Sequence, residues 1–108
     1  MILVTGAAGH IGNVLVRQLL QDGSRVRALV LPGEDTRALD KLDMEKVSGD
    51  VLDISSLMDA MQGVEFVYHL AGIISILPGR DERMWRVNVQ GTRNILQVAK
   101  EYGVKRVL

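Results

Sequence analysis

The segment Thr5-Gly6-Ala7-Ala8-Gly9-His10-Ile11-Gly12 stands between an apolar run and an amphipathic stretch. The apolar run, residues 2–5, contains β-branched residues and has the length of a buried strand. After the glycines, apolar residues recur at helical spacing as far as Asp22-Gly23, where the glycine suits the left-handed cap of a helix. We therefore expect the glycines at a corner where a strand turns into a helix.

Each glycine has a predicted task at this corner. Gly6 permits the tight turn out of the strand, Gly9 leaves room for a diphosphate to approach the backbone, and Gly12 lets the helix pack closely on the sheet. The unpaired N–H groups and the dipole of the helix would then face the anion. An ordinary turn is the alternative interpretation, and a P-loop is disfavoured because no Gly-Lys-Ser/Thr follows. The corner predicts a dinucleotide site.

The rest of the chain continues to alternate between strands and helices. Asp53 is expected to cap a helix whose apolar face is Ile54, Leu57, Met58 and Met61. The pattern predicts the α/β class, a Rossmann-type doubly wound parallel sheet with helices on both faces, in one domain over residues 1–108 that ends at the start of the fifth strand. The further strands are expected at 25–30, 46–48, 65–70 and from 105, and the further helices at 35–42 (short and weak) and 81–102.

The composition narrows the function classes. Hydrophobic residues make up 47% of the chain and charged residues 24%, as in ordinary globular domains. Thirteen basic residues balance thirteen acidic ones, so there is no positive excess to bind nucleic acid or an anionic membrane. Cysteine is absent, which excludes disulfides and thiolate metal sites, and we predict no metal site. The first apolar run is too short for a signal peptide or a membrane span, so we expect a cytoplasmic protein.

Four motifs resemble one family. The glycine spacing is similar to that of the extended short-chain dehydrogenases/reductases, also called the NAD-dependent epimerase/dehydratase family. Three more segments resemble motifs of that family in the same order: Gly49-Asp50-Val51-Leu52-Asp53, Tyr68-His69-Leu70-Ala71-Gly72 and Asn88-Val89-Gln90-Gly91-Thr92. The resemblance runs along the whole chain, and Ala71-Gly72-Ile73-Ile74 looks most like the dihydroflavonol reductase and 3β-hydroxysteroid dehydrogenase branch.

The resemblance implies a role for particular residues. Asp50 would meet the adenine amino group, with a simple turn cap as the alternative, and residues 70–72 would border the ribose and diphosphate. Asn88 would give structural support near the active site, while His69 is expected to be a hydrogen-bonded core histidine rather than a ligand. The implied cofactor-binding set is Gly6, Gly9, His10, Ile11, Gly12, Asp50, Val51, Leu70, Ala71 and Gly72.

The choice between NAD and NADP stays open. NAD enzymes usually carry an acid at the end of the second strand, where this chain has Val30, and NADP-preferring relatives often have arginine next, where it has Leu31. Glu34 or Asp35 could supply a carboxylate from the following loop, and Arg37 could supply a cation for a 2′-phosphate.

No catalytic residue is predicted within these 108 residues. The family's reaction uses a tyrosine and a lysine four positions later on one helix, with an upstream serine or threonine. Tyr68 has Gly72 at that distance, and Tyr102 has Arg106, with Gly103 breaking the helix between them. We expect the catalytic residues and the substrate-binding part to lie beyond Leu108 in a longer parent protein.

Three functions fit the sequence to different degrees. The first is the NAD(P)-binding portion of an oxidoreductase, epimerase or dehydratase that acts by hydride transfer on a hydroxyl or keto carbon of a small molecule. The second is a stand-alone dinucleotide-binding or redox-sensing module without turnover, and the third, less favoured, is a methyltransferase-like domain. Two partly apolar stripes on the helix 81–102 also suggest a homodimer, although the chain's own sheet and loops could cover them.

Overall fold

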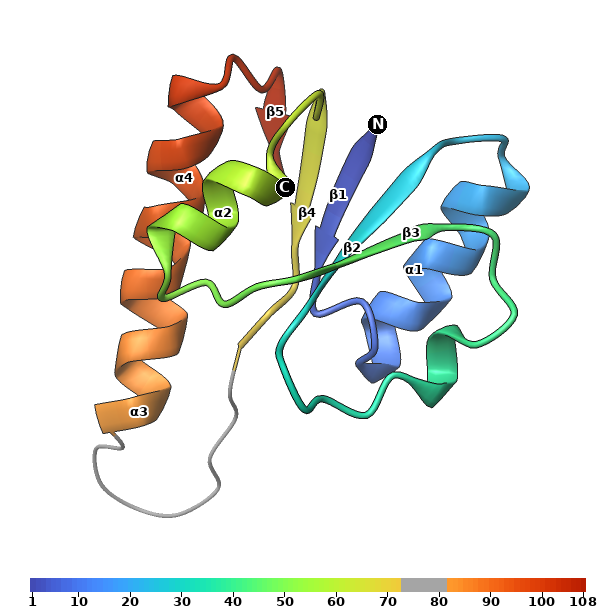
Figure 1. The fold of residues 1–108 in the computed structure, drawn as a ribbon, viewed down its shortest axis with the longest axis horizontal. Coiled ribbons are helices and arrows are strands. Elements are labelled where there is room, and N and C mark those ends of the chain that lie inside the picture. Colours follow the sequence, from blue (N-terminus) through green and yellow to red (C-terminus); the bar gives the residue numbers. More distant parts are fainter. Residues whose placement is uncertain (73–81) are drawn as a thin grey trace.

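The computed structural model describes residues 1–72 and 82–108. Within these ranges five parallel strands form one sheet in the order β3-β2-β1-β4-β5 (Figure 1). The predicted parallel α/β sheet is therefore confirmed, and each expected strand is present. The strands are β1 (Ile2–Thr5), β2 (Val26–Val30), β3 (Glu45–Ser48), β4 (Phe66–His69) and β5 (Arg106–Val107).

Helices cover both faces of the sheet, as predicted. Helix α1 (His10–Gln21) lies on one face, and α2 (Ile54–Ala60) and α4 (Gly91–Glu101) lie on the other (Figure 1). Successive strand residues point to opposite faces, so Leu3 packs in the cluster with α2 and α4, whereas Val4 packs in the cluster with α1. Two apolar cores, one on each side of β1, hold the central strand in place.

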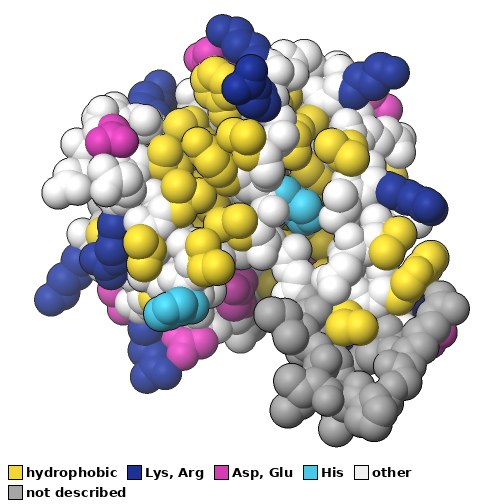
Figure 2. Space-filling view, turned by 180° about the vertical axis from the view of Figure 1, so that it is seen from behind, with side chains coloured by type: hydrophobic (Ala, Val, Ile, Leu, Met, Phe, Trp, Pro, Cys, Tyr) yellow, Lys and Arg dark blue, Asp and Glu magenta, His cyan; other side chains and the backbone are white. Residues whose placement is uncertain are grey.

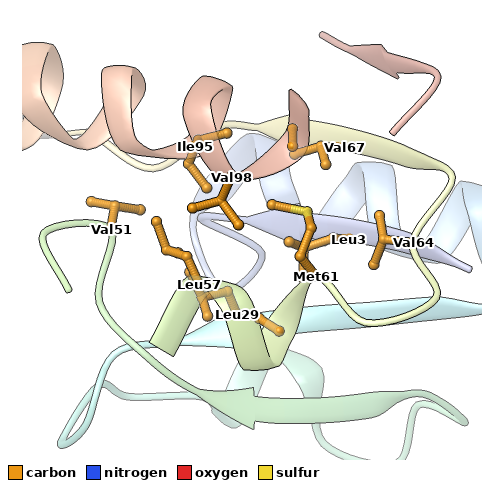
Figure 3. Packing of buried hydrophobic residues seen from close by; sticks show 11 residues of the cluster. Leu3, Leu29, Val51, Leu57, Met61, Val64, Val67, Ile95 and Val98 are labelled. Atoms are coloured by element: carbon orange, nitrogen blue, oxygen red, sulfur yellow. The ribbon is translucent and has the colours of Figure 1, made fainter. Parts of the chain in front are cut away.

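The core on this face is formed by side chains from α2, from α4 and from the sheet. Leu57 and Met61 reach up from α2 and its end, and Ile95 and Val98 come down from α4 (Figure 3). All four are fully buried, and each buried aliphatic side chain of this size contributes about 1.5–3 kcal/mol. Asp53 caps α2 as predicted, because its carboxylate accepts from the N–H groups of Ser55 and Ser56.

The predicted apolar face of α2 is partly wrong. Leu57 and Met61 are buried, but Ile54 and Met58 are 37% and 38% exposed, and Ala60 takes their place in the core. The helix is only seven residues long and turns Leu57, Ala60 and Met61 toward the sheet. Ala60 is nearly fully buried, which a pattern of larger apolar residues alone does not reveal.

The helix expected over 35–42 is wrong, apart from one 3₁₀ turn, η1 (Arg37–Leu39). The Asp35 carboxylate accepts from the backbone N–H of Arg37, a local turn that competes with helix formation. Lys41 adopts a left-handed conformation with φ of 65°, which ends any helix. Leu39 is nevertheless fully buried against the α1 core, so the loop is anchored.

The predicted helix 81–102 is present from Glu82 but is not uniform, and Asp81 lies outside the described residues. It consists of α3 (Glu82–Trp85), a π-helical turn η2 (Arg86–Gln90) and α4. The wider π turn shifts the phase of the side chains, so the two stripes expected from a regular period do not continue along the whole length. Trp85 is 40% exposed, whereas Ile95 and Ala99, which a regular helix would place on the same stripe as Trp85, are buried.

One face of the molecule keeps apolar side chains at its surface. Figure 2, which views the molecule of Figure 1 from behind, shows hydrophobic side chains gathered on this face. They lie on the α1 half of the molecule. On α1, Ile11 is 71% exposed and Val14 is 60% exposed. In the described part of the chain, no helix is both long and apolar enough to cross a membrane.

Candidate functional site

The fold places a cleft at the carboxyl ends of its central strands. The chain leaves β1 toward β2 on one side and returns from β3 to β4 on the other, so the connections diverge between β1 and β4. In open α/β sheets, ligands bind at such a point. A cleft of about 390 Å³ lies here and is lined by Thr5, Gly6, Gly9, Leu29, Leu31, Glu34, Gly49, Asp50, Val51, Leu52, Leu70, Ala71, Gly72, Arg83 and Val87.

Two of the three glycines are required by the packing of the corner itself. Gly6 has φ of +69°, and a β-carbon on it would lie 2.6 Å from the carbonyl carbon of Leu70. A β-carbon on Gly12 would lie 2.0 Å from the carbonyl oxygen of Gly6. Gly12 therefore lets the first turn of α1 lie directly against the glycine turn, while the helix packs on the sheet as predicted.

Gly9 is different, because its missing side chain leaves space rather than backbone contact. A β-carbon there would meet only the Gly6 oxygen, at 3.3 Å. Gly9 is exposed, lines the cleft and is the N-cap of α1, which has no side-chain cap. The amino end of the helix consequently opens on the cleft, and its first N–H groups are available to an anion.

His10 and Ile11 lie in the first turn of α1, next to this opening. Both side chains are exposed, and neither residue lines the cleft. What they bring to the site is backbone, since the N–H groups of a first helical turn have no partner within the helix. Their assignment to the cofactor site stays a prediction.

A chain of hydrogen bonds joins the ends of β1 and β4 to helix α4. The Thr5 hydroxyl lies 2.7 Å from His69 Nδ1 and accepts from the backbone N–H groups of Leu70 and Ala71. His69 Nε2 lies 3.0 Å from the Thr92 hydroxyl, which itself donates to the carbonyl oxygen of Asn88 at 2.7 Å. The network holds the Leu70–Ala71 backbone against Gly6.

The network determines the proton position on His69. Thr92 has one hydroxyl proton and gives it to a carbonyl, so its oxygen accepts from Nε2–H of the ring. Nδ1 is then free to accept from Thr5, whose oxygen already accepts two N–H groups. Burial lowers the pKa of His69 below its ordinary value, in agreement with this neutral ring. Both ring nitrogens have partners, as expected of a hydrogen-bonded core histidine.

The second motif, Gly49–Asp53, forms the turn after β3. Asp50 lines the cleft and also caps this turn, because its Oδ1 accepts from the N–H of Leu52 at 2.9 Å. Val51 is held from the other side by α4: its carbonyl oxygen accepts from the buried Asn94 amide at 2.9 Å, and its side chain would clash with a β-carbon on Gly91 at 2.6 Å. Asp50 is therefore a turn cap and a residue of the cleft at the same time, so the two interpretations of Asp50 do not exclude each other.

The fourth motif supports the site from behind, and its neighbours enter the cleft. Asn88 lies beside Gly72, where a β-carbon would come within 3.1 Å of the amide oxygen. Arg83 and Val87 line the cleft from α3 and η2, although sequence reasoning singled out neither for the site. The one sequence feature that could have indicated these two residues is their position in the chain, between the β4 segment and the fourth motif.

The loop that follows Val30 forms the β2 side of the cleft, and only some of its charged residues lie there. Leu31 and Glu34 line the cleft, whereas Asp35 and Arg37 do not. Asp35 and Arg37 form a two-point ion pair, with Nη2–Oδ2 at 2.7 Å and Nε–Oδ1 at 3.0 Å. The Arg37 guanidinium lowers the pKa of Asp35, and the Asp35 carboxylate raises that of Arg37.

The two tyrosines lie outside this cleft. Tyr68 is half-buried on β4 and packs against the α1 core, and Tyr102 ends helix α4 with its hydroxyl 3.4 Å from the Gln62 amide. A wider hollow of about 820 Å³ lies at the amino ends of the strands, lined by residues that include Met1, Arg25 and Glu45. Its lining includes Gly23 at the carboxyl end of α1 but no residue of the glycine turn 6–12 and no helix amino end, so the smaller cleft is the candidate site.

Curated relatives share the whole length of the chain. It is 47% identical over 106 residues to sterol demethylase protein B of Methylococcus capsulatus, covering 98% of this chain and 32% of that protein. It is 40% identical to a putative dihydroflavonol 4-reductase of Synechocystis, covering 97% and 30%, and 32% identical to a 3-beta-hydroxysteroid dehydrogenase of Mycolicibacterium neoaurum, also covering 97% and 30%. The chain spans about a third of the length of these relatives.

Solved structures agree. A short-chain dehydrogenase/reductase superfamily protein of Agrobacterium tumefaciens with bound NAD superposes with a TM-score of 0.83 at 38% identity, covering 99% of this chain and 31% of that one. The Thermus thermophilus UDP-glucose 4-epimerase complex with NAD gives 0.86 at 27% identity, covering 98% and 35%. The family model described as the NAD dependent epimerase/dehydratase family matches residues 2–108, and the chain belongs to this family.

Proposed function

We propose that this chain is the dinucleotide-binding part of an NAD(P)-dependent oxidoreductase, epimerase or dehydratase. The observation that carries the proposal is the uncapped amino end of α1, which opens at Gly9 on a cleft between the ends of β1 and β4. That corner offers a diphosphate free N–H groups and the positive end of a helix dipole. The NAD-bound relatives support the same assignment.

The residues around the cleft fit the two ends of a dinucleotide. Gly9, His10, Ile11 and Gly12 would hold the diphosphate through backbone N–H groups, and Asp50 and Val51 would border the adenine. Leu70, Ala71 and Gly72 would line the path toward the nicotinamide, with their backbone positioned by Thr5 and His69. When bound, the nicotinamide would supply hydride transfer at a hydroxyl or keto carbon of a small-molecule substrate.

The whole protein's location and assembly complete the proposal. We place it in the cytoplasm, because the absence of cysteine fits a reducing compartment. A homodimer through the helical segment 82–101 is supported by the exposed Trp85 and Leu96, at 40% and 51%. Sedimentation at high protein concentration tests the dimer, and a monomer would contradict it.

Calorimetric titration with NADH, NADPH and S-adenosylmethionine tests the proposed function. We expect at least one nicotinamide dinucleotide to bind and S-adenosylmethionine not to bind. Gly9→Ala should weaken dinucleotide binding about tenfold or more, since its new methyl group stands where the diphosphate approaches the backbone. Val14→Thr, on the exposed face of α1, is the matched control and should bind as the unchanged protein does. Binding of S-adenosylmethionine alone would contradict the proposal.

A further inference from the structure

The cleft extends from the glycine turn to the end of β2. Thr5 pairs with Leu29 across the two strands, so the turn that follows β1 lies beside the residues that follow β2. Leu29, Leu31 and Glu34 line this part of the cleft. A dinucleotide with its diphosphate at the amino end of α1 has its adenosine ribose at the end of the second strand.

A tight turn brings a carboxylate back to this strand end. The Glu34 N–H donates to the Leu31 carbonyl at 2.9 Å, and Gly33 has φ of +82°. Proline at the second position and a left-handed glycine at the third are typical of a type II turn. The turn reverses the chain, and the Leu31 N–H donates to Glu34 Oε2 at 2.9 Å. The carboxylate therefore lies one residue beyond β2, although Val30 and Leu31 are apolar.

Glu34 is the charged residue of this loop that lines the cleft. Arg37, the cation that could take a 2′-phosphate from this loop, is paired at two points with Asp35 and does not line the cleft. Arg83 does line the cleft, from helix α3, and Asp50 lines it from the turn after β3. In the described part of the chain, Oε2 of Glu34 accepts from Leu31, and Oε1 carries no hydrogen bond.

We infer that Glu34 selects NAD over NADP by accepting hydrogen bonds from the adenosine ribose hydroxyls and repelling a 2′-phosphate. The inference rests on the proposed function and adds a cofactor preference to it. The acid that NAD enzymes usually place at the end of the second strand comes here from the fourth position of a turn. A 2′-phosphate carries about two negative charges at neutral pH, so a carboxylate within contact distance opposes it strongly.

Parallel titrations with NADH and NADPH test the inference. The unchanged protein should bind NADH about 10- to 100-fold more tightly than NADPH. Glu34→Gln keeps the shape and a hydrogen-bond acceptor but removes the charge, and it should reduce this ratio about tenfold, mainly by improving NADPH binding. Asp59→Asn removes one exposed charge from α2, outside the cleft, and should leave the ratio unchanged.

Titrations with ADP-ribose and with ADP-ribose 2′-phosphate test whether the preference arises at the adenosine ribose. The two compounds should show the same ratio as the full dinucleotides, since both contain the ribose that Glu34 would contact. Equal affinities for NADH and NADPH would overturn the inference alone, as would a ratio that Glu34→Gln leaves unchanged. A preference for NADPH that Arg37→Gln or Arg83→Gln abolishes would do the same. Failure of both dinucleotides to bind would overturn the proposed function and this inference together.

Discussion

The two walls of the cleft are built in different ways. The wall at β1 and β4 is closed by backbone packed on backbone, with Gly6 against Leu70 and Gly12 against Gly6. The wall at β2 is an exposed turn from Leu31 to Glu34 that holds itself by two local hydrogen bonds. The first wall tolerates few side chains because it has no spare volume, while the second can change its residues without disturbing the sheet.

This difference separates affinity from selectivity. The interlocked wall presents the helix amino end that a diphosphate of either cofactor would use. The loop wall presents the side chain that distinguishes one ribose from another. A substitution in the first wall should therefore cost folding stability, and a substitution in the second should alter ligand choice while the fold persists.

The largest expected effect is on Gly12. Gly12→Ala places a β-carbon 2.0 Å from the Gly6 carbonyl oxygen, inside the backbone of the turn. We expect a loss of about 3 kcal/mol or more in the free energy of unfolding, measured by urea denaturation. Gly9→Ala is the matched control, since its β-carbon meets the same oxygen at 3.3 Å, and it should cost less than about 1 kcal/mol. Equal losses for the two variants would refute the distinction between the glycines.

Removal of the Thr5 hydroxyl should have the next largest effect. Thr5→Val deprives the Ala71 N–H and the His69 ring of a buried partner while the side chain keeps its shape. Unsatisfied buried groups of this kind cost about 1–3 kcal/mol, seen in the same denaturation experiment. Thr5→Ser retains the hydroxyl and should recover most of the loss. If serine and valine behave alike, the hydroxyl does not hold the β4 end.

A smaller effect should appear as a pH dependence of stability. Burial lowers the pKa of His69, so the unfolded chain takes up a proton at a higher pH than the folded chain does. The contribution of the neutral ring is complete above the ordinary histidine pKa of about 6.5 and is lost as the pH falls below it. Stability should decrease between about pH 7 and pH 5, and His69→Gln should make this slope shallower. The same slope in His69→Gln and in the unchanged protein would contradict this prediction.

The sequence predicts the interlocked wall better than the loop wall, for a physical reason. Gly6 and Gly12 are fixed by contacts that no other residue permits, so their spacing is visible as a motif. The position of Glu34 depends on a turn that returns the carboxylate toward Leu31, and the sequence leaves three charged candidates open. In the structure, Asp35 and Arg37 pair with each other instead.

The helices likewise show where prediction from sequence patterns fails. The cap at Asp53 and four of the strands follow from local patterns, the strand 46–48 follows mainly from the alternation of the whole chain, and all are present where expected. The region 35–42 depends on the competition between a helix and the turn at Asp35, which composition does not resolve. The π turn at 86–90 likewise shifts the buried stripe in a way that a regular period does not express.

The most direct test of the account is to map the backbone amide signals that NAD or ADP-ribose perturbs in nuclear magnetic resonance. We predict the largest changes at Gly9 to Gly12, where the diphosphate would meet the helix, with smaller changes at Leu31 to Glu34 and Leu70 to Gly72. Changes concentrated around the wider hollow near Met1, Arg25 and Glu45, with the glycine corner unaffected, would contradict it.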